Sequence, residues 1–467
     1  MRTAHLLVLA LLPCALHATT WTVGAGQTHT LPSQVSTLVN DGDTVDILAG
    51  TYPGDVAAWA ANDLLLRGVG GMAVLPANGN SWGGKAIWVI QGDRTRVEHI
   101  AFLDCSVPDQ NGAGIRQEGS DLTVRHCLFQ DNENGILGGE VHPSTIRIEH
   151  STFDHNGYGD GYSHNLYIGR VDSLIFRYNY SHHAHVGHEL KSRAWVNVIE
   201  YNRFSNEADG DASREIDLPD GGQAYLIGNV VQQGPQGQNS NLVGFAMEST
   251  VNPGPHALYA VNNTLVNEKT VGSFFQMPAA VYFKAYSNIL AGGGSFMSAW
   301  PTTVDTLANI RSTSIAALDF ANATTYDYHI GTASPADGTG VPAGLASNGY
   351  PLVAWDEYVH PAGRITRCQQ ALLDAGAFET CTTGEAEASS ARATLYPVPA
   401  QDEVTVSGMD AGTALVELID ASGRIHLERT VVFAGPWRLD IGPYAAGPYL
   451  LRITGTQGTT CLRVIKE

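Results

Sequence analysis

The chain has 467 residues, and its 46 acidic side chains against 26 basic ones give a formal net charge of −20. Nucleic acid is therefore excluded as the expected partner, because phosphate binding needs a basic surface. Hydrophobic residues make up 43% of the chain and charged residues 15%, with 51 glycines, which indicates a folded, loop-rich β protein rather than a disordered one. This length predicts one elongated domain plus a small module.

Residues 1–19 have the pattern of a secretory signal peptide. They begin with a basic residue, continue with an apolar run from Leu6 to Leu12 and end near the small residue Ala18. No later segment is apolar over the length that a transmembrane helix needs. We therefore expect an exported protein that has no transmembrane segment and is a monomer.

Cysteines in an exported chain are candidates for disulfides. Besides Cys14 in the signal peptide, the chain contains Cys105, Cys127, Cys368, Cys381 and Cys461. Cys368 and Cys381 bracket a short segment and are predicted to form a local disulfide. A bond between Cys105 and Cys127 is a second possibility.

Eight short β-type segments share one register, as in EHSTFDH, RYNYSHH and EYNRFSN. Their equivalent positions are Ile100, Cys127, Ser151, Asn179, Asn202, Asn229, Asn263 and Asn288. The spacing ranges from 23 residues between Asn179 and Asn202 to 34 between Asn229 and Asn263. Such a period, without helical segments in between, predicts a parallel β solenoid. The five asparagines at equivalent positions predict a hydrogen-bonded ladder inside it.

Several features together resemble the right-handed parallel β-helix proteins of the pectate-lyase-like superfamily. They are the coil length, the asparagine ladder, the entry segment VNDGDTVDILAGTY and the exit segments YHIGTASPADGTG and DAGAFE. The resemblance covers roughly Trp21 to Thr380 and implies that residues 20–380 form an all-β, right-handed parallel β-helix. That superfamily contains lyases, hydrolases, epimerases and non-catalytic binders, so the fold alone does not define the activity.

The composition changes after this region. Residues 381–394 are small and polar and are predicted to be a linker. Residues 395–467 alternate apolar and polar positions between turn residues, which predicts a small antiparallel β-sandwich.

The segments LYPVPAQDEVTV, ALVELIDASGR, YAAGPYLLRITG and LRVIKE closely resemble the C-terminal sorting domain of the type IX secretion system. The resemblance implies a source among the Bacteroidota and engagement of the type IX machinery. It also implies secretion or display on the cell surface, and usually removal of this domain. A carbohydrate-binding or spacer sandwich is the alternative.

Three segments of the solenoid align in a second register: SHNLYIG from Ser163, GHELKSR from Gly187 and SREIDLP from Ser213. Alternate side chains of a strand face opposite ways. This period places one set toward the core: Leu166, Ile168, Leu190, Ser192, Ile216 and Leu218. It places two rows outward, which we call the outward strip: Asn165, Glu189 and Glu215, then Tyr167, Lys191 and Asp217. Arg193 extends the strip, and His164, His188 and Arg214 share a register at its edge.

The outward strip gathers groups that suit the cleavage of an extended, uronate-containing polysaccharide. β-Elimination needs neutralisation of the sugar carboxylate, a base for the proton next to it and an acid for the leaving oxygen. Lys191 is the candidate base, since Arg193 on the same face would favour its neutral form. Tyr167, one coil away, is the candidate acid. Glu189, Glu215 and Asp217 are candidate ligands for a calcium ion that would engage the substrate carboxylate.

The stretch ELKSRAWVNVIEYNRF, followed by IDLPDGGQAYLIGN, is similar in arrangement to the lysine-bearing segment of family 6 polysaccharide lyases, the alginate and chondroitin lyases. The resemblance implies that Lys191 is the base. Where that family has an arginine, this chain has Pro219, and Arg214 lies five residues earlier. The two calcium-binding glutamates of the family are not at their usual spacing. The sequence thus predicts a polysaccharide lyase with catalytic candidates Lys191, Tyr167, Arg193, His188 and Arg214.

Two other functions stay open at this point. A glycoside hydrolase would use paired carboxylates, either Glu189 with Glu215 or Glu189 with Asp217. A non-catalytic adhesin or glycan-binding solenoid would use the strip as a docking face. Under each of these hypotheses His164, Asn165 and Trp195 are candidate substrate-binding residues.

The run SHHAHVGH contains His182, His183, His185 and His188, and histidine is a common transition-metal ligand. Its spacing is not typical of zinc sites. A role for His188 or His164 in substrate positioning or proton transfer is the favoured interpretation, and a solvated histidine-rich loop is the alternative.

Overall fold

The computed structural model describes residues 18–298, 301, 303–368, 372–380, 394–409, 412–420, 424–455 and 458–466. The predicted signal peptide lies outside the described residues except for its last two positions, and the predicted linker lies outside except for Thr394. In the part of the chain that is described, no helix has both the length and the hydropathy needed to cross a membrane.

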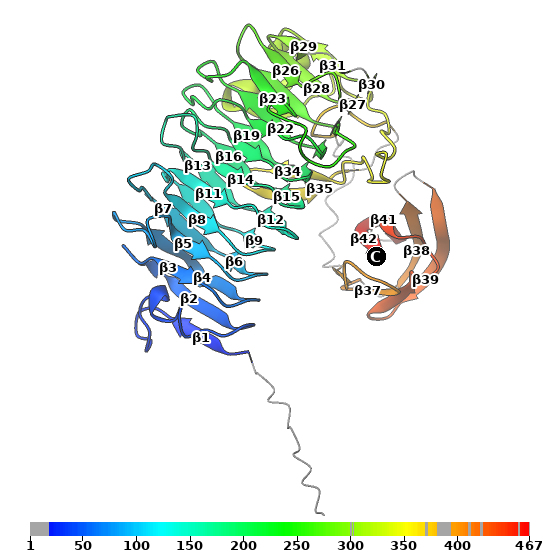
Figure 1. Ribbon diagram of the computed structural model, residues 1–467. Helices are drawn as coiled ribbons and strands as arrows, with labels where there is room; N and C mark the ends of the chain where they lie inside the picture. Colours follow the sequence, from blue (N-terminus) through cyan, green and yellow to red (C-terminus); the bar gives the residue numbers. More distant parts are fainter. Residues whose placement is uncertain are drawn as a thin grey trace, which may run out of the picture.

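The described strands from β1 to β31 form a parallel β-helix, in which they stack coil upon coil (Figure 1). One wall is a sheet of ten parallel strands: β3 (Ala57–Trp59), β5 (Ala86–Ile90), β8 (Ala113–Gln117), β11 (Asn134–Gly138), β14 (Leu166–Ile168), β17 (Leu190–Ser192), β20 (Ile216–Leu218), β23 (Asn241–Phe245), β26 (Ser273–Gln276) and β29 (Ser295–Ser298).

The other wall is a 21-stranded parallel sheet to which most coils contribute two strands. These are β1 (Thr20–Val23), β2 (Thr44–Thr51), β4 (Leu65–Pro76), β6 (Arg96–Glu98), β7 (Ile100–Leu103), β9 (Thr123–Arg125), β10 (Leu128–Gln130), β12 (Thr145–Glu149), β13 (Thr152–Asp154), β15 (Ser173–Arg177), β16 (Tyr180–His182), β18 (Val196–Glu200), β19 (Arg203–Ser205), β21 (Gln223–Ile227), β22 (Val230–Gln233), β24 (Ala257–Val261), β25 (Thr264–Asn267), β27 (Tyr282–Tyr286), β28 (Ile289–Gly292), β30 (Thr303–Leu307) and β31 (Ile310–Ser312).

The core between the two walls is a set of stacked apolar columns. Phe102, Phe129 and Phe153 stack in successive coils with ring centroids 5.1 and 4.8 Å apart. The six residues predicted to face inward from the ten-stranded sheet are all buried: Leu166, Ile168, Leu190, Ser192, Ile216 and Leu218. That part of the sequence prediction is confirmed.

The predicted asparagine ladder is present at the turn between the two strands of each coil. The Asn202 side chain accepts from the backbone N–H of Asn179 at 2.9 Å and donates to Asn229 Oδ1 at 3.0 Å. The same bonds continue through Asn263 and Asn288. They also reach Asn309, which lies beyond the predicted ladder. Each asparagine thus satisfies buried backbone groups of neighbouring coils.

The chain after the last coil folds back over the 21-stranded sheet rather than only closing its end. Its elements are η2 (Ile315–Leu318), β32 (Phe320–Asn322), η3 (Ala323–Thr325), β33 (Asp327–Ile330), β34 (Asp356–Val359) and β35 (Gly363–Thr366). Leu352 packs in one apolar cluster with Tyr201 and Tyr259, and Phe378 packs in another with Ile289. At the other end of the chain, η1 (Pro32–Gln34) follows β1.

The C-terminal domain is the predicted antiparallel sandwich. One sheet contains β36 (Thr394–Tyr396), β37 (Glu403–Ser407) and β40 (Trp437–Asp440), and the other contains β38 (Gly412–Asp420), β39 (Ile425–Phe433), β41 (Gly447–Gly455) and β42 (Gly458–Lys466). Val404 and Leu439 of the first sheet share an apolar core with Val416 and Leu451 of the second.

The cysteines separate into two groups. Cys368 is disulfide-bonded, and Cys381, its predicted partner, lies outside the described residues. Cys105 and Cys127 are buried free thiols, so the second predicted pair is wrong. Burial raises the pKa of both thiols to about 12, which keeps them protonated and unreactive.

Replacing Asn229 with alanine tests the ladder. The change removes the acceptor for the Asn202 backbone N–H and the donor to the Ile199 carbonyl, both fully buried. Because each of the two buried polar groups left without a partner costs about 1–3 kcal/mol, we expect the free energy of unfolding to fall by roughly 2–6 kcal/mol. Denaturant unfolding measures this loss. The exposed Asn111, whose side chain donates to the nearby Asp109 carbonyl, is the control, and an equal effect of Asn111→Ala would contradict the assignment.

Candidate functional site

The second predicted row of the outward strip is in the predicted register. Tyr167 of β14 pairs with Lys191 of β17, and Lys191 pairs with Asp217 of β20. The row continues through Gly244 of β23 to Gln276 of β26. Five coils therefore contribute to one line on the outer face of the ten-stranded sheet, with four side chains and, at Gly244, a gap.

The first predicted row does not face outward. Asn165, Glu189 and Glu215 have no solvent exposure. The physical reason is that β14, β17 and β20 begin one residue later, at Leu166, Leu190 and Ile216. The three residues therefore lie at the corner before each strand, where the two-residue alternation does not hold.

At this corner the Glu189 carboxyl is held entirely by the protein. It accepts hydrogen bonds from the Ala184 backbone N–H at 2.9 Å and from Asn165 Nδ2 at 2.5 Å. Ser181 Oγ lies 3.0 Å from the same carboxyl. Burial, the largest effect, raises the pKa of Glu189 to about 8 despite these bonds, and it raises the pKa of Glu215 well above its usual value. Both groups are therefore protonated near neutral pH.

Lys191 lies between two carboxylates. Its Nζ is 3.0 Å from Glu248 Oε1 and 3.6 Å from Asp217 Oδ2. The Lys191 side chain is 13% exposed and that of Asp217 only 2%, whereas Glu248 is 49% exposed. Glu248 is thus the carboxylate that solvent reaches.

Arg193 lies beside Lys191 and joins three groups. Its Nε donates to the Tyr167 hydroxyl oxygen at 2.9 Å, and its two terminal nitrogens contact Asp220 at 2.6 Å and Glu248 at 2.5 Å. Because Arg193 occupies a lone pair of the Tyr167 oxygen, the phenolic proton is left to point elsewhere. Asp220, which is 1% exposed, also binds Arg170 at 2.9 Å.

Arg214 reaches the strip from the corner before β20. It contacts Asp217 at 2.6 Å and Gln276 Oε1 at 2.5 Å, and so crosses over β23. Gly244 makes room for it, because a Cβ there would lie 2.6 Å from the Arg214 guanidinium and 2.8 Å from Asp217. The Asp217 carboxylate therefore bridges Lys191 and Arg214.

His164 and His188 form the predicted edge column, with rings stacked 4.9 Å apart and 9° from parallel. His164 Nδ1 accepts from the His188 backbone N–H at 3.0 Å, and His188 Nδ1 accepts from the Arg214 backbone N–H at 3.1 Å. Burial, followed by the positive charge of Lys191, lowers the pKa of His188 to about 3. Burial also lowers the pKa of His164. Both rings are therefore neutral with the proton on Nε2, which makes them donors rather than bases.

Residues 246–256 form a loop over the strip, which we call the Glu248 loop. The backbone N–H groups of Glu248 and Ser249 donate to the Pro219 carbonyl at 3.1 and 3.0 Å. Asn252 Nδ2 donates to the carbonyls of Arg193, Ala194 and Gly221 at 3.0–3.2 Å. Burial acts to raise the pKa of Glu248, but hydrogen bonds from Arg193 and Lys191 lower it to about 2. Its carboxylate is charged at any working pH.

Sequence reasoning missed several parts of this site: Glu248, Asn252, Asp220, Arg170 and Gly244. The available signal was the 34-residue spacing between Asn229 and Asn263, since extra residues in one coil must leave the sheet as a loop. Nothing in the repeat pattern showed that this loop covers Lys191.

Trp195 does not form an exposed aromatic platform. It is partly buried at the turn after β17, and its indole nitrogen is buried without a hydrogen-bond partner in the described structure. Asn165, a second candidate for substrate contact, lies inside the core.

The three carboxylates considered for calcium do not fit such a site. Glu189 and Glu215 have no solvent exposure, and the Glu189 carboxyl already accepts hydrogen bonds from the protein, so neither presents free oxygens of the kind that calcium needs. Asp217 is surrounded by Lys191, Arg214 and His188, which are all hydrogen-bond donors or cations. The cationic side chains, rather than a bound metal, are the groups available for an anion.

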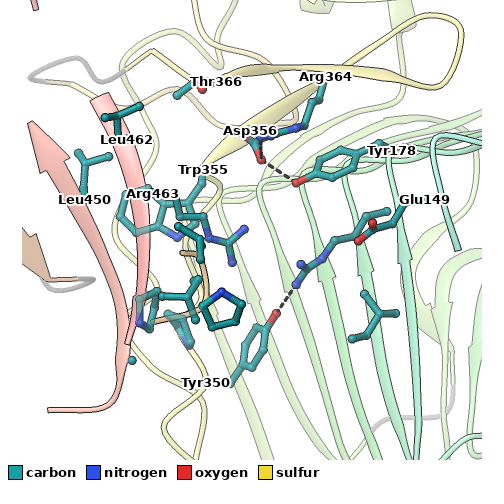
Figure 2. Close-up of a pocket in the computed structure, with 18 of the residues that line it drawn as sticks. Glu149, Tyr178, Tyr350, Trp355, Asp356, Arg364, Thr366, Leu450, Leu462 and Arg463 are labelled. Atoms are coloured by element: carbon teal, nitrogen blue, oxygen red, sulfur yellow. Dashed lines mark hydrogen bonds and ion pairs between the residues drawn. The ribbon is translucent and has the colours of Figure 1, made fainter. Parts of the chain in front are cut away.

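A separate pocket lies over the 21-stranded sheet, lined by that sheet, by residues 348–366 and by the C-terminal domain (Figure 2). The Tyr178 hydroxyl donates to Asp356 at 2.7 Å, and Arg177 pairs with Glu200 at 2.9 Å. These groups already satisfy one another. The C-terminal domain supplies part of this pocket through Leu395, Leu450, Leu462 and Arg463.

The described chain is a parallel β-helix followed by a small antiparallel sandwich. Residues 394–467 match the family described as the secretion system C-terminal sorting domain, which confirms the resemblance for that domain. This domain indicates type IX secretion and engagement of its machinery. No curated protein matches the chain.

Glu189 makes the free energy of unfolding depend on pH. The folded chain keeps a proton up to about pH 8, while the unfolded chain releases it near the ordinary value of 4.5. Because the folded state binds more protons in this window, stability falls as pH rises through it. Glu189→Gln does not titrate, so we expect its stability to fall less between these pH values, by on the order of a few kcal/mol.

Denaturant unfolding at several pH values measures this difference. Asp109→Asn, at an exposed acid, is the control and should follow the wild type. A Glu189→Gln profile parallel to the wild type would show that Glu189 is ionised in the folded chain.

Proposed function

We propose that this protein is a polysaccharide lyase that cleaves a uronate-containing glycan by β-elimination on the outer face of the ten-stranded sheet. The observation that carries the proposal is the Glu248 carboxylate, which bridges Lys191 Nζ at 3.0 Å and Arg193 at 2.5 Å. This pair of cations already has the geometry that a sugar carboxylate would need. The net charge of −20 is thus compatible with an acidic substrate, because the positive charge is local.

Glu248 is the carboxylate that a substrate would replace. The side chains of Asp217 and Asp220 are only 2% and 1% exposed, whereas Glu248 is half exposed and lies on a loop. Leaving Asp217 and Asp220 in place would keep the cations oriented. A uronate carboxylate would then exchange one ion pair for another, and little desolvation cost would be added.

The remaining groups divide the proton transfers. Lys191 would first release its ammonium proton to solvent and would then, as the neutral amine, take the proton next to the carboxylate, while Arg193 keeps that carboxylate paired. Tyr167 would donate to the leaving glycosidic oxygen, since Arg193 occupies its lone pair and leaves its proton free. Arg193 and Arg214 would stabilise the negative charge that develops on the carboxylate.

The geometry argues against the paired-carboxylate hydrolase. Glu189 and Glu215 lie inside the core, where no glycan reaches them. Asp217, the alternative partner, is 2% exposed and engaged by cations. The assay described next also tests the third hypothesis, a non-catalytic glycan-binding solenoid.

The lyase proposal predicts that Lys191→Ala loses activity. We expect at least ~10²-fold less 4,5-unsaturated product, measured by ultraviolet absorbance on a panel of alginate, pectate, chondroitin and hyaluronan, because general-base removal costs this much. Lys284→Ala is the matched control, since Lys284 is also 13% exposed and pairs with Asp305 on the other sheet. Reducing ends without absorbance would identify a hydrolase, and binding without products a non-catalytic solenoid.

Weakening the ion pair of Glu248 should increase the affinity for the substrate. Glu248→Gln removes the competing negative charge. We therefore expect oligouronates to bind roughly tenfold more tightly, which corresponds to about 1.4 kcal/mol. Calorimetric titration measures the change. Asp63→Asn is the control, because Asp63 is 48% exposed and pairs with Arg94 away from the strip. Weaker binding by Glu248→Gln would mean that Glu248 contacts the glycan directly.

A further inference from the structure

Four ligand-type side chains meet at the corner that follows β13 and β16. Asp154 and His182 are opposite each other in the parallel register of these strands. His155 and His183 come next in each coil, and both have left-handed backbone, with φ of 52° and 54°. The two coils therefore present an Asp-His pair directly beside a His-His pair.

The side chains turn their donor atoms toward one another. His182 Nδ1 lies 2.7 Å from His183 Nδ1 and 3.4 Å from Asp154 Oδ1. His155 Nδ1 contacts the same Asp154 oxygen. One ligand atom from each of Asp154, His155 and His183 lies within 4.8 Å of the others. The rings of His155 and His183 stack 4.7 Å apart, as neighbours in a column do.

We propose that Asp154, His155, His182 and His183 bind a divalent transition-metal ion, with Zn²⁺ as the best match. Three imidazole nitrogens and one carboxylate oxygen are a donor set that suits Zn²⁺ and disfavours Ca²⁺ and Mg²⁺. Ligands about 2.0–2.2 Å from a tetrahedral ion are separated by roughly 3.3–3.6 Å, so small side-chain rotations would complete the site.

This site is distinct from the outward strip and does not depend on the lyase proposal. The side chains of His182 and His183 are 14% and 11% exposed, whereas His155 is 56% exposed and gives an ion access from solvent. Asp209, which lies 3.3 Å from the second nitrogen of His183, would orient that ring as a carboxylate often does behind a zinc-bound histidine. The ion would join two successive coils at one corner.

Zinc titration of the full chain, carried on a tag without histidine and stripped of metal beforehand, tests the site. We expect one equivalent of Zn²⁺ to bind by calorimetry, a Zn²⁺-dependent rise in the unfolding midpoint, and intense visible bands of tetrahedral Co²⁺ on substitution. His155→Ala and His183→Ala should each weaken binding at least tenfold. His155 is half exposed, so its variant tests the site even if the His183 variant fails to fold.

The matched control is His185→Ala. His185 is in the same histidine run and is 55% exposed, but it pairs with Asp211 and is outside the cluster. Its variant should bind Zn²⁺ as the wild type does. The proposal is overturned if no stoichiometric Zn²⁺ binds, if Ca²⁺ binds in its place, or if the His155 and His183 variants retain wild-type affinity.

Discussion

The structure depends on one constraint, the parallel stacking of coils that places equivalent residues one strand spacing apart. A polar group on the inner side of a coil corner is then buried between the coils before and after it, and the next coil must satisfy it. The ladder from Asn179 to Asn309 meets this demand with side chains that each donate and accept. The same stacking lines up Tyr167, Lys191 and Asp217 on the outer face and the two histidine-bearing corners beside each other.

The corner between β16 and β17 links these features. On its inner side the Glu189 carboxyl bonds Ser181 and Asn165, and Asn165 also donates to the His182 carbonyl at 2.9 Å. On its outer side His182 and His183 turn toward Asp154. Glu189 is thus a structural support, two residues before Lys191, rather than part of the reacting surface. A protonated carboxyl suits this place because it avoids a buried charge.

The sequence predicted the features that recur from coil to coil. The ladder, the inward residues of β14, β17 and β20 and the Tyr167–Lys191–Asp217 row all follow from a repeat alignment plus the two-residue period. The alternation of side chains predicts an outward position for Asn165 and Glu189 only if it extends one residue beyond the start of the strand, which it does not.

The position of Glu248 could not be predicted, since a loop inserted in one coil has no counterpart in the repeat. The alignment of the segments EHSTFDH and RYNYSHH already places Asp154 and His182 at equivalent positions. The usual sequence spacings of zinc ligands do not apply to them, because these ligands come from two different coils.

The central claim is that Lys191 and Arg193 bind a sugar carboxylate in place of Glu248. The most direct test compares the binding of each uronate oligosaccharide with that of its methyl ester, which keeps the shape and removes the charge. We expect that at least one free acid binds and that its ester binds at least tenfold more weakly. Equal affinity for acid and ester, or no binding of any free acid, would contradict it.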